Sequence, residues 1–257
     1  DLPEAIDPEN QMVGRLLNNV TSMAYGTDQN LFALIVVEGV ILSLKYGVTD
    51  HSAHMFALFA ALTGSKLGFF AAGEDLGRLA VALSNRFDHP GQRCRTYFDM
   101  AAFVYGWTNH PRDCFPYALE SYRLARETGD NIYSCYTISE YCSKLLGVGT
   151  PLDEAGPAIA KYTDYVVRQA RDDFMSPLVL ALNQTVRNLR GETRNRLSLS
   201  DEEFDEEAFI QQINQAGQGQ MDWYHTNKAR LLFYYGAYEE AFAAAQKAEE
   251  RLIYAFA

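Results

Sequence analysis

The chain has 257 residues, of which 22 are Lys or Arg, 33 are Asp or Glu and 48% are hydrophobic. A net charge of −11 disfavours binding to a nucleic-acid backbone, and the apolar content disfavours intrinsic disorder. These figures leave a folded chain of one or two domains.

The first residues carry no secretion signal, because Asp1 is followed by Pro3 and Glu4 rather than by a basic and then an apolar segment. Together with an apolar helical pattern that runs up to Ala257, this opening predicts a fragment of a longer protein. The most apolar stretch, residues 31–44, contains Glu38 and is followed by Lys45. We interpret it as a buried helix and expect no membrane span and a cytoplasmic protein.

Hydrophobic residues recur with a helical period from residue 8 onward, and no strand-like alternation is sustained. Gly, Asp and Pro interrupt the period every 15 to 25 residues, which is typical of helices joined by tight turns. The pattern predicts an opening helix pair at 8–24 and 29–46, and then the first helices of further pairs at 52–70, 92–108, 132–147, 176–189 and 219–235.

The second helices of these pairs share an apolar pattern at offsets 0, 3, 4 and 7, with a small residue at offset 3 or 4. Its first members lie 39, 37 and 86 positions apart, so a unit of about 40 residues repeats. The four sets are Leu76, Leu79, Ala80, Leu83; Phe115, Ala118, Leu119, Tyr122; Leu152, Ala155, Gly156, Ile159; and Tyr238, Ala241, Phe242, Ala245.

One helical hairpin cannot bury its own apolar face, so repeated hairpins must stack. The sequence therefore predicts an all-α fold, a right-handed α-solenoid of about six TPR-like hairpins that forms a single domain over residues 1–257.

Residues from about 190 to 207 depart from the repeat. This segment contains Arg190, Arg194 and Arg196, followed by an acidic run. We interpret it as an irregular insertion or a degenerate helix. A helix start is predicted at Ser200, since Ser200 resembles an N-cap and Glu203 follows three residues later.

Several short strings resemble one family. They occur in the same order and with similar spacing in the helical region of very large bacterial signalling proteins. The strings are LSLKYG at 42–47 followed by Ser52-Ala53, ETGD at 127–130, FDEE at 204–207, and the YEEA that opens the last hairpin at 238–241.

In that family the helical arm lies between a STAND-type AAA ATPase and a GAF sensor, in proteins that also carry a serine/threonine-kinase-like domain and often a histidine kinase. The resemblance implies a connecting and sensing arm whose partners are the adjoining ATPase and sensor or kinase domains. The chain itself lacks a P-loop and the protein-kinase motifs. We therefore expect no enzymatic activity and no cofactor in this part.

Individual reactive residues are interpreted as structural. The cysteines at 94, 114, 135 and 142 lack paired metal-ligand spacing and are expected to pack in the core of a reduced protein. His51 and His54 could share a helical face, but no third ligand stands nearby, so no metal site is expected. An enzyme with a closed polar pocket is the least favoured alternative.

Aromatic residues, 13% of the chain, suggest where a partner binds. Several fall on predicted first helices beside polar residues, and first helices line the concave surface of stacked hairpins. Tyr, Trp and Arg dominate binding hot spots, although aromatic residues also fill spaces between helices. The candidate partner-binding residues are Tyr105, Trp107, Tyr136, Tyr141, Trp223, Tyr224, Lys228 and Arg230.

Two functions remain open. The first is a non-catalytic interaction and signal-relay module of a multidomain bacterial signalling protein. The alternative is an autonomous helical-repeat sensor whose concave groove binds a peptide or small ligand, with its acidic charge favouring a cationic peptide.

Overall fold

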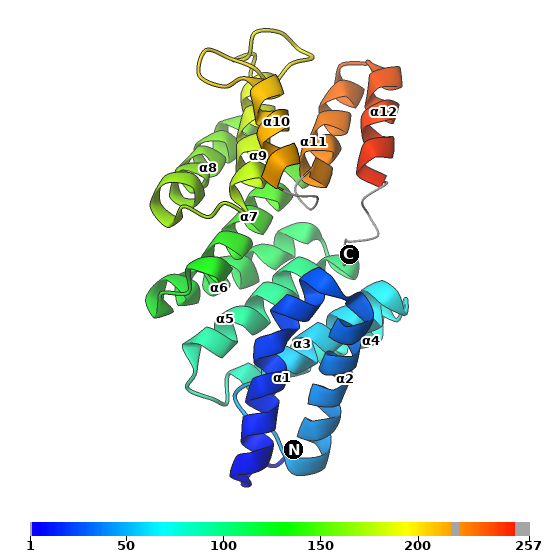
Figure 1. The fold of residues 1–257 in the computed structure, drawn as a ribbon, viewed down its shortest axis with the longest axis vertical. Coiled ribbons are helices and arrows are strands. Elements are labelled where there is room, and N and C mark those ends of the chain that lie inside the picture. Colours follow the sequence, from blue (N-terminus) through cyan, green and yellow to red (C-terminus); the bar gives the residue numbers. More distant parts are fainter. Residues whose placement is uncertain (1, 217–220, 250–257) are drawn as a thin grey trace. The chain divides into compact units, whose positions relative to one another are not determined.

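The structure, a computed structural model, describes residues 2–216 and 221–249, which fold almost entirely into helices (Figure 1). Within these ranges there are twelve α-helices and no strand. The predicted all-α class is therefore confirmed. The chain divides into two compact units, with the first ending at Thr137 and the second beginning at Ile138. This boundary falls inside α7 (Asn131–Gly147), and the single domain over residues 1–257 stays a prediction.

Unit 1 consists of helices that pack against their neighbours in sequence. The packed pairs are α1 (Pro8–Thr27) with α2 (Gln29–Tyr46), α3 (Ser52–Ala61) with α4 (Phe70–Ser84), and α5 (Pro90–Asp99) with α6 (Phe115–Thr128). The π-helical segments η1 (Leu62–Lys66) and η2 (Met100–Val104) extend α3 and α5, and the short 3₁₀ turns η3 (Tyr105–Trp107) and η4 (Pro111–Cys114) lead into α6. Because α3 also contacts α2 and α5, it lies at the centre of this unit.

A single aspartate joins α1 to α2. The backbone N–H of Asp28 donates to the carbonyl of Ala24 at 2.8 Å and so closes α1. The Asp28 carboxylate accepts from the backbone N–H groups of Asn30 and Leu31, at 2.9 and 3.1 Å, and caps α2. The turn between the two helices is therefore short, in agreement with the predicted helix pair at 8–24 and 29–46.

Two glycines let α4 approach its neighbours closely. A Cβ added to Gly73 would lie 2.8 Å from the carbonyl oxygen of Ala60 in α3. A Cβ on Gly77 would lie 2.7 Å from the sulfur of Met100. These positions have no room for a larger side chain, so the packing of α4 depends on them.

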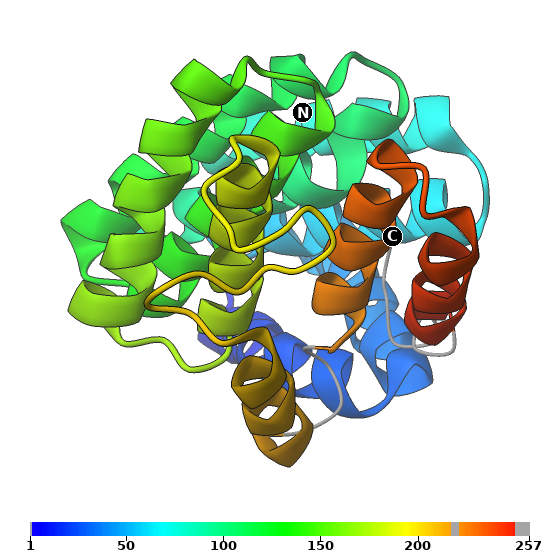
Figure 2. The ribbon, with the colours of Figure 1, turned by 90° about the horizontal axis from the view of Figure 1, so that it is seen from above.

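Unit 2 contains the end of α7 followed by five helices. They are α8 (Leu152–Asp164) with its π-helical extension η5 (Tyr165–Ala170), α9 (Ser176–Leu189), α10 (Glu206–Ala216), α11 (Met221–Tyr234) and α12 (Tyr238–Glu249). α8 packs against α9, and α11 packs against both α9 and α12. Figures 1 and 2 show α11 and α12 side by side.

One predicted helix ends earlier than the pattern indicates. The pattern predicts a single helix over 52–70, but α3 and η1 end at Lys66, and Phe70 is the first residue of α4. Gly68 between them has φ +76°, a left-handed conformation that ends a helix. The prediction placed Phe70 in the wrong helix.

The helix predicted to start at Ser200 begins at Glu206 instead. Asp201 Oδ1 accepts from the backbone N–H groups of Glu203 and Phe204, at 2.7 and 2.8 Å, which closes a turn rather than a helix. Asp205 accepts from the N–H of Ala208 and caps α10. The predicted cap at Ser200 is therefore wrong, whereas the irregular segment before it is observed.

Candidate interaction surface

The first two helices expose apolar side chains along their whole length. On α1 the exposed fractions reach 53% for Met12, 56% for Leu16 and 72% for Met23. On α2 they reach 56% for Leu34 and 57% for Leu44. We call this surface the outer face; its members are Met12, Val13, Leu16, Val20 and Met23 of α1 with Leu31, Leu34, Ile41 and Leu44 of α2.

The opposite sides of both helices are buried in unit 1. Asn18 of α1 contacts His54 of α3, and Phe32 and Val36 of α2 belong to the same hydrophobic cluster as Met55. Because the exposed residues lie on the other side of each helix, the outer face points away from α3. Helices at the surface of a protein normally present polar residues there, so the outer face is unusual.

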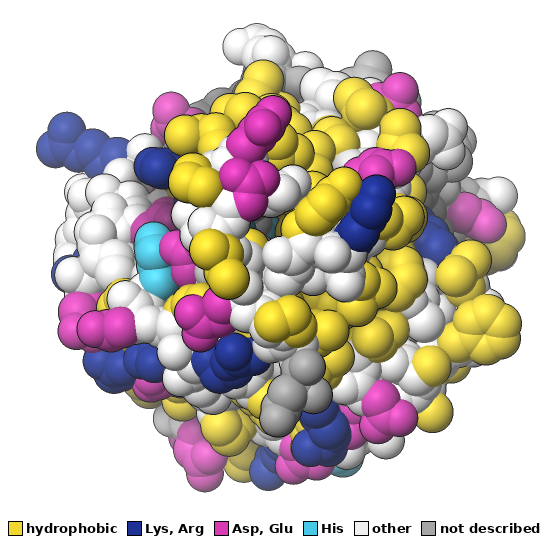
Figure 3. Space-filling view, turned by 90° about the horizontal axis from the view of Figure 1, so that it is seen from below, with side chains coloured by type: hydrophobic (Ala, Val, Ile, Leu, Met, Phe, Trp, Pro, Cys, Tyr) yellow, Lys and Arg dark blue, Asp and Glu magenta, His cyan; other side chains and the backbone are white. Residues whose placement is uncertain are grey.

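Figure 3 shows one face of the molecule on which hydrophobic side chains gather, with a few acidic and basic side chains between them. The helix α2 carries apolar residues on all sides, together with the exposed Glu38 and Lys45. By length and composition it is the one helix in the described part of the chain that could cross a membrane, although core helices pass the same test. The interpretation of 31–44 as a buried helix holds only for one side: Phe32, Ile35, Val36 and Val40 are buried, while Leu31, Leu34, Ile41 and Leu44 are exposed.

The predicted residues Tyr105 and Trp107 lie in η3, next to the start of α4. The Trp107 ring is 48% exposed and its centroid lies 5.2 Å from that of Phe70. The guanidinium of Arg78 lies 5.2 Å from the centroid of the Tyr105 ring. Arg78 also pairs with Glu74, so aromatic and charged groups meet here.

Glu74 holds this group together. Its carboxylate accepts hydrogen bonds from the Thr108 hydroxyl and from Arg78. The hydrogen bond from the Thr108 hydroxyl lowers the pKa of Glu74, and Arg78 lowers it further. Partial burial of the carboxyl group acts in the opposite direction. These contacts hold Arg78 and Thr108 beside Tyr105 and Trp107. The role of Tyr105 and Trp107 in partner binding stays a prediction.

Tyr136 and Tyr141, on α7, are half-buried against other rings. The ring centroid of Tyr136 lies 5.8 Å from that of Tyr133 and 6.0 Å from that of Phe98, all within unit 1. The ring centroid of Tyr141 lies 6.0 Å from that of Tyr162 within unit 2. Each of the two tyrosine rings is therefore packed against aromatic residues of its own unit.

The predicted residues of α11 are mostly engaged inside unit 2. Tyr224 is 4% exposed and its hydroxyl donates to Glu206 at 2.8 Å, while Lys228 Nζ lies 2.6 Å from the same carboxylate oxygen. Trp223 packs edge-on against Phe174 at 5.5 Å. Arg230 is half-buried on the same helix. A groove that used Tyr224 or Lys228 would have to break their contacts with Glu206.

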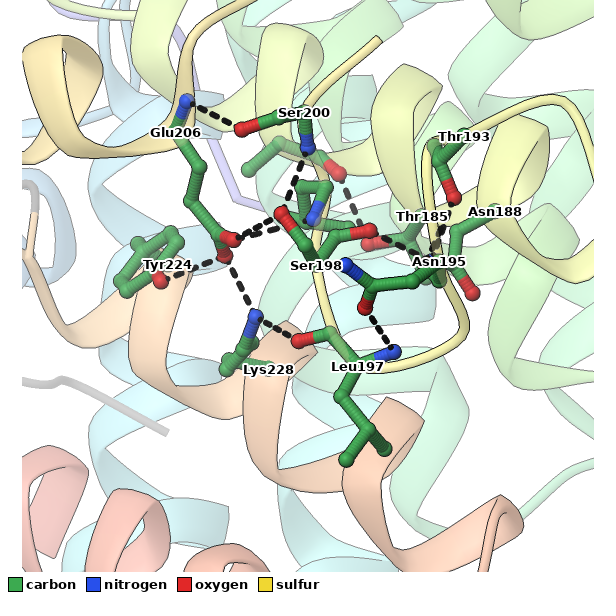
Figure 4. Close-up of polar contacts among 12 residues, drawn as sticks. Thr185, Asn188, Thr193, Asn195, Leu197, Ser198, Ser200, Glu206, Tyr224 and Lys228 are labelled. Carbon is green, nitrogen blue, oxygen red and sulfur yellow. Dashed lines mark hydrogen bonds and ion pairs between the residues drawn. The ribbon is translucent and has the colours of Figure 1, made fainter.

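Glu206 is the centre of this polar cluster, which Figure 4 shows. Its second carboxylate oxygen accepts from the backbone N–H of Leu199 and from the hydroxyl of Ser198, both at 3.0 Å. Burial alone would raise the pKa of Glu206, but Lys228, the Leu199 N–H and the Tyr224 hydroxyl together lower it. The irregular segment is therefore fastened to α10 and α11 by one carboxylate.

Asn188, at the end of α9, holds the other side of the irregular segment (Figure 4). Its side-chain amide donates to Thr193 Oγ1 and to the carbonyls of Asn195 and Ser198, at 2.8, 3.1 and 2.7 Å. Neither Asn188 nor Glu206 was predicted as a site residue from the sequence. Glu206 entered only as part of the string FDEE at 204–207, and it follows Asp205 at a helix start, where acidic residues are common.

His51, His54 and all four cysteines are at least partly buried. His51 precedes the first turn of α3, and His54 is buried at 2% exposure. All four cysteines are buried, as predicted, and burial raises the pKa of the Cys94 thiol to about 12 and that of Cys142 further. In the described ranges no cluster of His, Cys, Asp and Glu side chains is arranged to hold a metal ion.

No protein-family model, curated protein or solved structure matches this chain.

Proposed function

We propose that this chain is a protein-interaction and signal-relay arm of a larger bacterial signalling protein, and that the outer face of α1 and α2 is its contact surface. The observation that carries this proposal is the exposure of Met12, Leu16, Met23, Leu34 and Leu44 on the first helix pair. Apolar side chains that recur along one side of two adjacent helices are typical of surfaces that another protein element covers.

The helix pairs support a repeat architecture. Sequential pairing of α1 with α2, α3 with α4 and α5 with α6 within unit 1 is the arrangement of stacked hairpins. In a stack the terminal pair needs a polar outer side to remain soluble. The outer face of α1 and α2 is apolar instead, so in this proposal the stack of a right-handed, TPR-like solenoid is completed by another protein element.

Relay follows from the way a repeat array deforms. Each helix pair contacts its neighbours, so a small rotation imposed at one pair is passed to the next and accumulates along the array. The proposed sources of such a rotation are the adjoining ATPase and sensor or kinase domains that the family resemblance implies. The arm itself is proposed to be non-catalytic and cytoplasmic; the protonated state of its buried thiols fits that role.

Cross-linking of the full parent protein tests the proposal. Lys45 borders the outer face, whereas Lys161 lies on α8 in unit 2. We expect a lysine-directed reagent to join Lys45 to residues outside this chain or to another copy of it. Lys161 serves as the internal reference for random cross-links. If Lys45 forms no cross-links above that reference in any nucleotide state, the outer face is not a contact surface.

A pair of surface variants provides the matched control. The double substitution Leu16→Glu and Leu34→Glu places charges on the outer face without touching the buried sides of α1 and α2. Phe242→Glu replaces an exposed apolar side chain by a charged one on α12, outside the outer face; Phe242 is 66% exposed. We expect the double variant, and not Phe242→Glu, to lose the Lys45 cross-links while its circular dichroism stays that of the wild type.

A further inference from the structure

The exposed side of α2 carries a coiled-coil spacing. Leu31, Leu34, Glu38, Ile41 and Lys45 follow one another at intervals of 3, 4, 3 and 4 residues, and all five are exposed. This is the a and d spacing of two heptads, which keeps a narrow stripe on one side of a helix facing a partner helix. We call these five residues the α2 stripe.

The two charges of the α2 stripe have opposite signs and stand seven residues apart. Glu38 forms no ion pair with any residue in the described part of the chain, and Lys45 Nζ lies over the ring of the adjacent Tyr46 at 4.9 Å. Covering the stripe with an apolar partner would bury Glu38 without a counter-charge, which is costly. A suitable occupant must therefore offer a cation to Glu38 and an anion to Lys45.

A second copy of α2 meets this requirement. Resting on the function proposed above, we propose that the occupant of the outer face is a second copy of this chain, with the two α2 helices antiparallel about a two-fold axis. Ile41 lies close to the midpoint between positions 38 and 45, so an axis there sets Ile41 near its own copy. The two α2 helices then overlap over residues 37–46, which include Glu38, Ile41 and Lys45 of the stripe. Glu38 of each chain then lies beside Lys45 of the other, and both ion pairs form by symmetry.

The same charges select against other arrangements. Parallel pairing in register sets Glu38 against Glu38 and Lys45 against Lys45, which is repulsive. Insertion into a lipid bilayer leaves Glu38 in hydrocarbon without a partner. The exposed apolar residues of α1, which packs against α2, add to the area that the second copy can cover.

Charge exchange tests the antiparallel pair. Sedimentation velocity on the wild-type chain over about 1 to 100 μM should show a reversible monomer–dimer equilibrium. Glu38→Lys and Lys45→Glu should each raise the dimer dissociation constant about tenfold or more, because each sets like charges together twice. The double variant restores both pairs with reversed signs, and its constant should return to within about threefold of the wild type.

The controls separate this proposal from the broader one. Glu249→Lys makes the same charge change at an exposed position at the end of α12 and should leave the dimer unchanged. A monomeric wild type, or a double variant as weak as the single ones, would overturn the second copy as occupant. Flotation of monomeric wild type with phosphatidylcholine vesicles would also overturn it and assign the face to lipid. Lys45 cross-links to another domain of the parent protein would keep the proposed function even if the dimer fails.

Discussion

His54 of α3 and Asp99 at the end of α5 face each other inside unit 1, with His54 Nε2 3.1 Å from Asp99 Oδ2 and each side chain 2% exposed. The other ring nitrogen, Nδ1, lies 2.6 Å from the side-chain oxygen of Asn18 in α1. Burial raises the pKa of Asp99, and the neighbouring His54 opposes that rise. One imidazole thus connects three helices that lie far apart in the sequence.

Replacing this imidazole should destabilise unit 1 strongly. His54→Ala removes the partner of a fully buried carboxyl group and leaves a cavity, so we expect a loss of about 3 kcal/mol in the free energy of unfolding. Urea denaturation measures it. His110→Ala changes an exposed histidine and should cost less than about 1 kcal/mol. Equal stability of the two variants would show that the His54 contacts contribute nothing.

The Glu206 cluster should stabilise the irregular segment. Glu206→Gln removes the charge that Lys228 and three other donors face. We expect the free energy of unfolding to fall by about 2 kcal/mol at neutral pH. Hydrogen exchange should rise at Ser198 and Leu199, which donate hydrogen bonds to this carboxylate. Glu207→Gln, at the exposed neighbouring position, is the control and should leave both measurements unchanged.

The stability that Glu206 provides should depend on pH with a definite sign. Because its folded-state pKa lies below the ordinary value of 4.5, the folded chain binds this proton less tightly than the unfolded chain. The contribution is therefore complete above pH 4.5 and is lost as the pH falls through the folded-state pKa. Unfolding of wild type and Glu206→Gln should converge in acid; a difference that grows toward low pH would contradict the assigned ion pair.

The approach of α4 to α3 should not tolerate a methyl group. Gly73→Ala sets a Cβ 2.8 Å from the carbonyl oxygen of Ala60, a backbone atom that cannot move away alone. We expect this substitution to lower the free energy of unfolding by about 2 kcal/mol. Gly26→Ala, where the added Cβ meets nothing within 4 Å, is the matched control and should be neutral or slightly stabilising. Thermal unfolding of both variants tests the contrast.

Helix positions could be predicted from the sequence where a local signal marks both ends. The predictions 29–46 and 176–189 coincide with α2 and α9 because Asp28 caps α2, Gly47 ends it, and Pro177 stands in the first turn of α9. Near Ser200, two adjacent side chains can accept hydrogen bonds from the backbone N–H groups that follow: the Ser200 hydroxyl and the Asp201 carboxylate. The N–H groups of Glu203 and Phe204 donate to Asp201 and form a turn. The sequence alone does not predict which of the two acceptors binds them.

Which side of a helix is buried was harder to predict. α2 is apolar all round, so its periodicity did not distinguish the buried Phe32 and Val36 from the exposed Leu34 and Ile41. The contact of His54 with Asp99 joins residues 45 positions apart, and Glu206 meets Lys228 across 22 positions. No local pattern encodes such pairs, which arise only when the helices pack.

The six methionines of the chain offer a direct test of the central claim that the outer face is covered in the parent protein. Met12 and Met23 are 53% and 72% exposed on that face, whereas Met55, Met100, Met175 and Met221 are buried. Hydroxyl-radical footprinting should oxidise Met12 and Met23 readily in the isolated chain at high dilution. In the purified parent protein we expect both to be protected about fivefold or more, to a level near that of the buried methionines. Equal oxidation of Met12 and Met23 in the two samples would contradict the assignment of α1 and α2 as a contact surface.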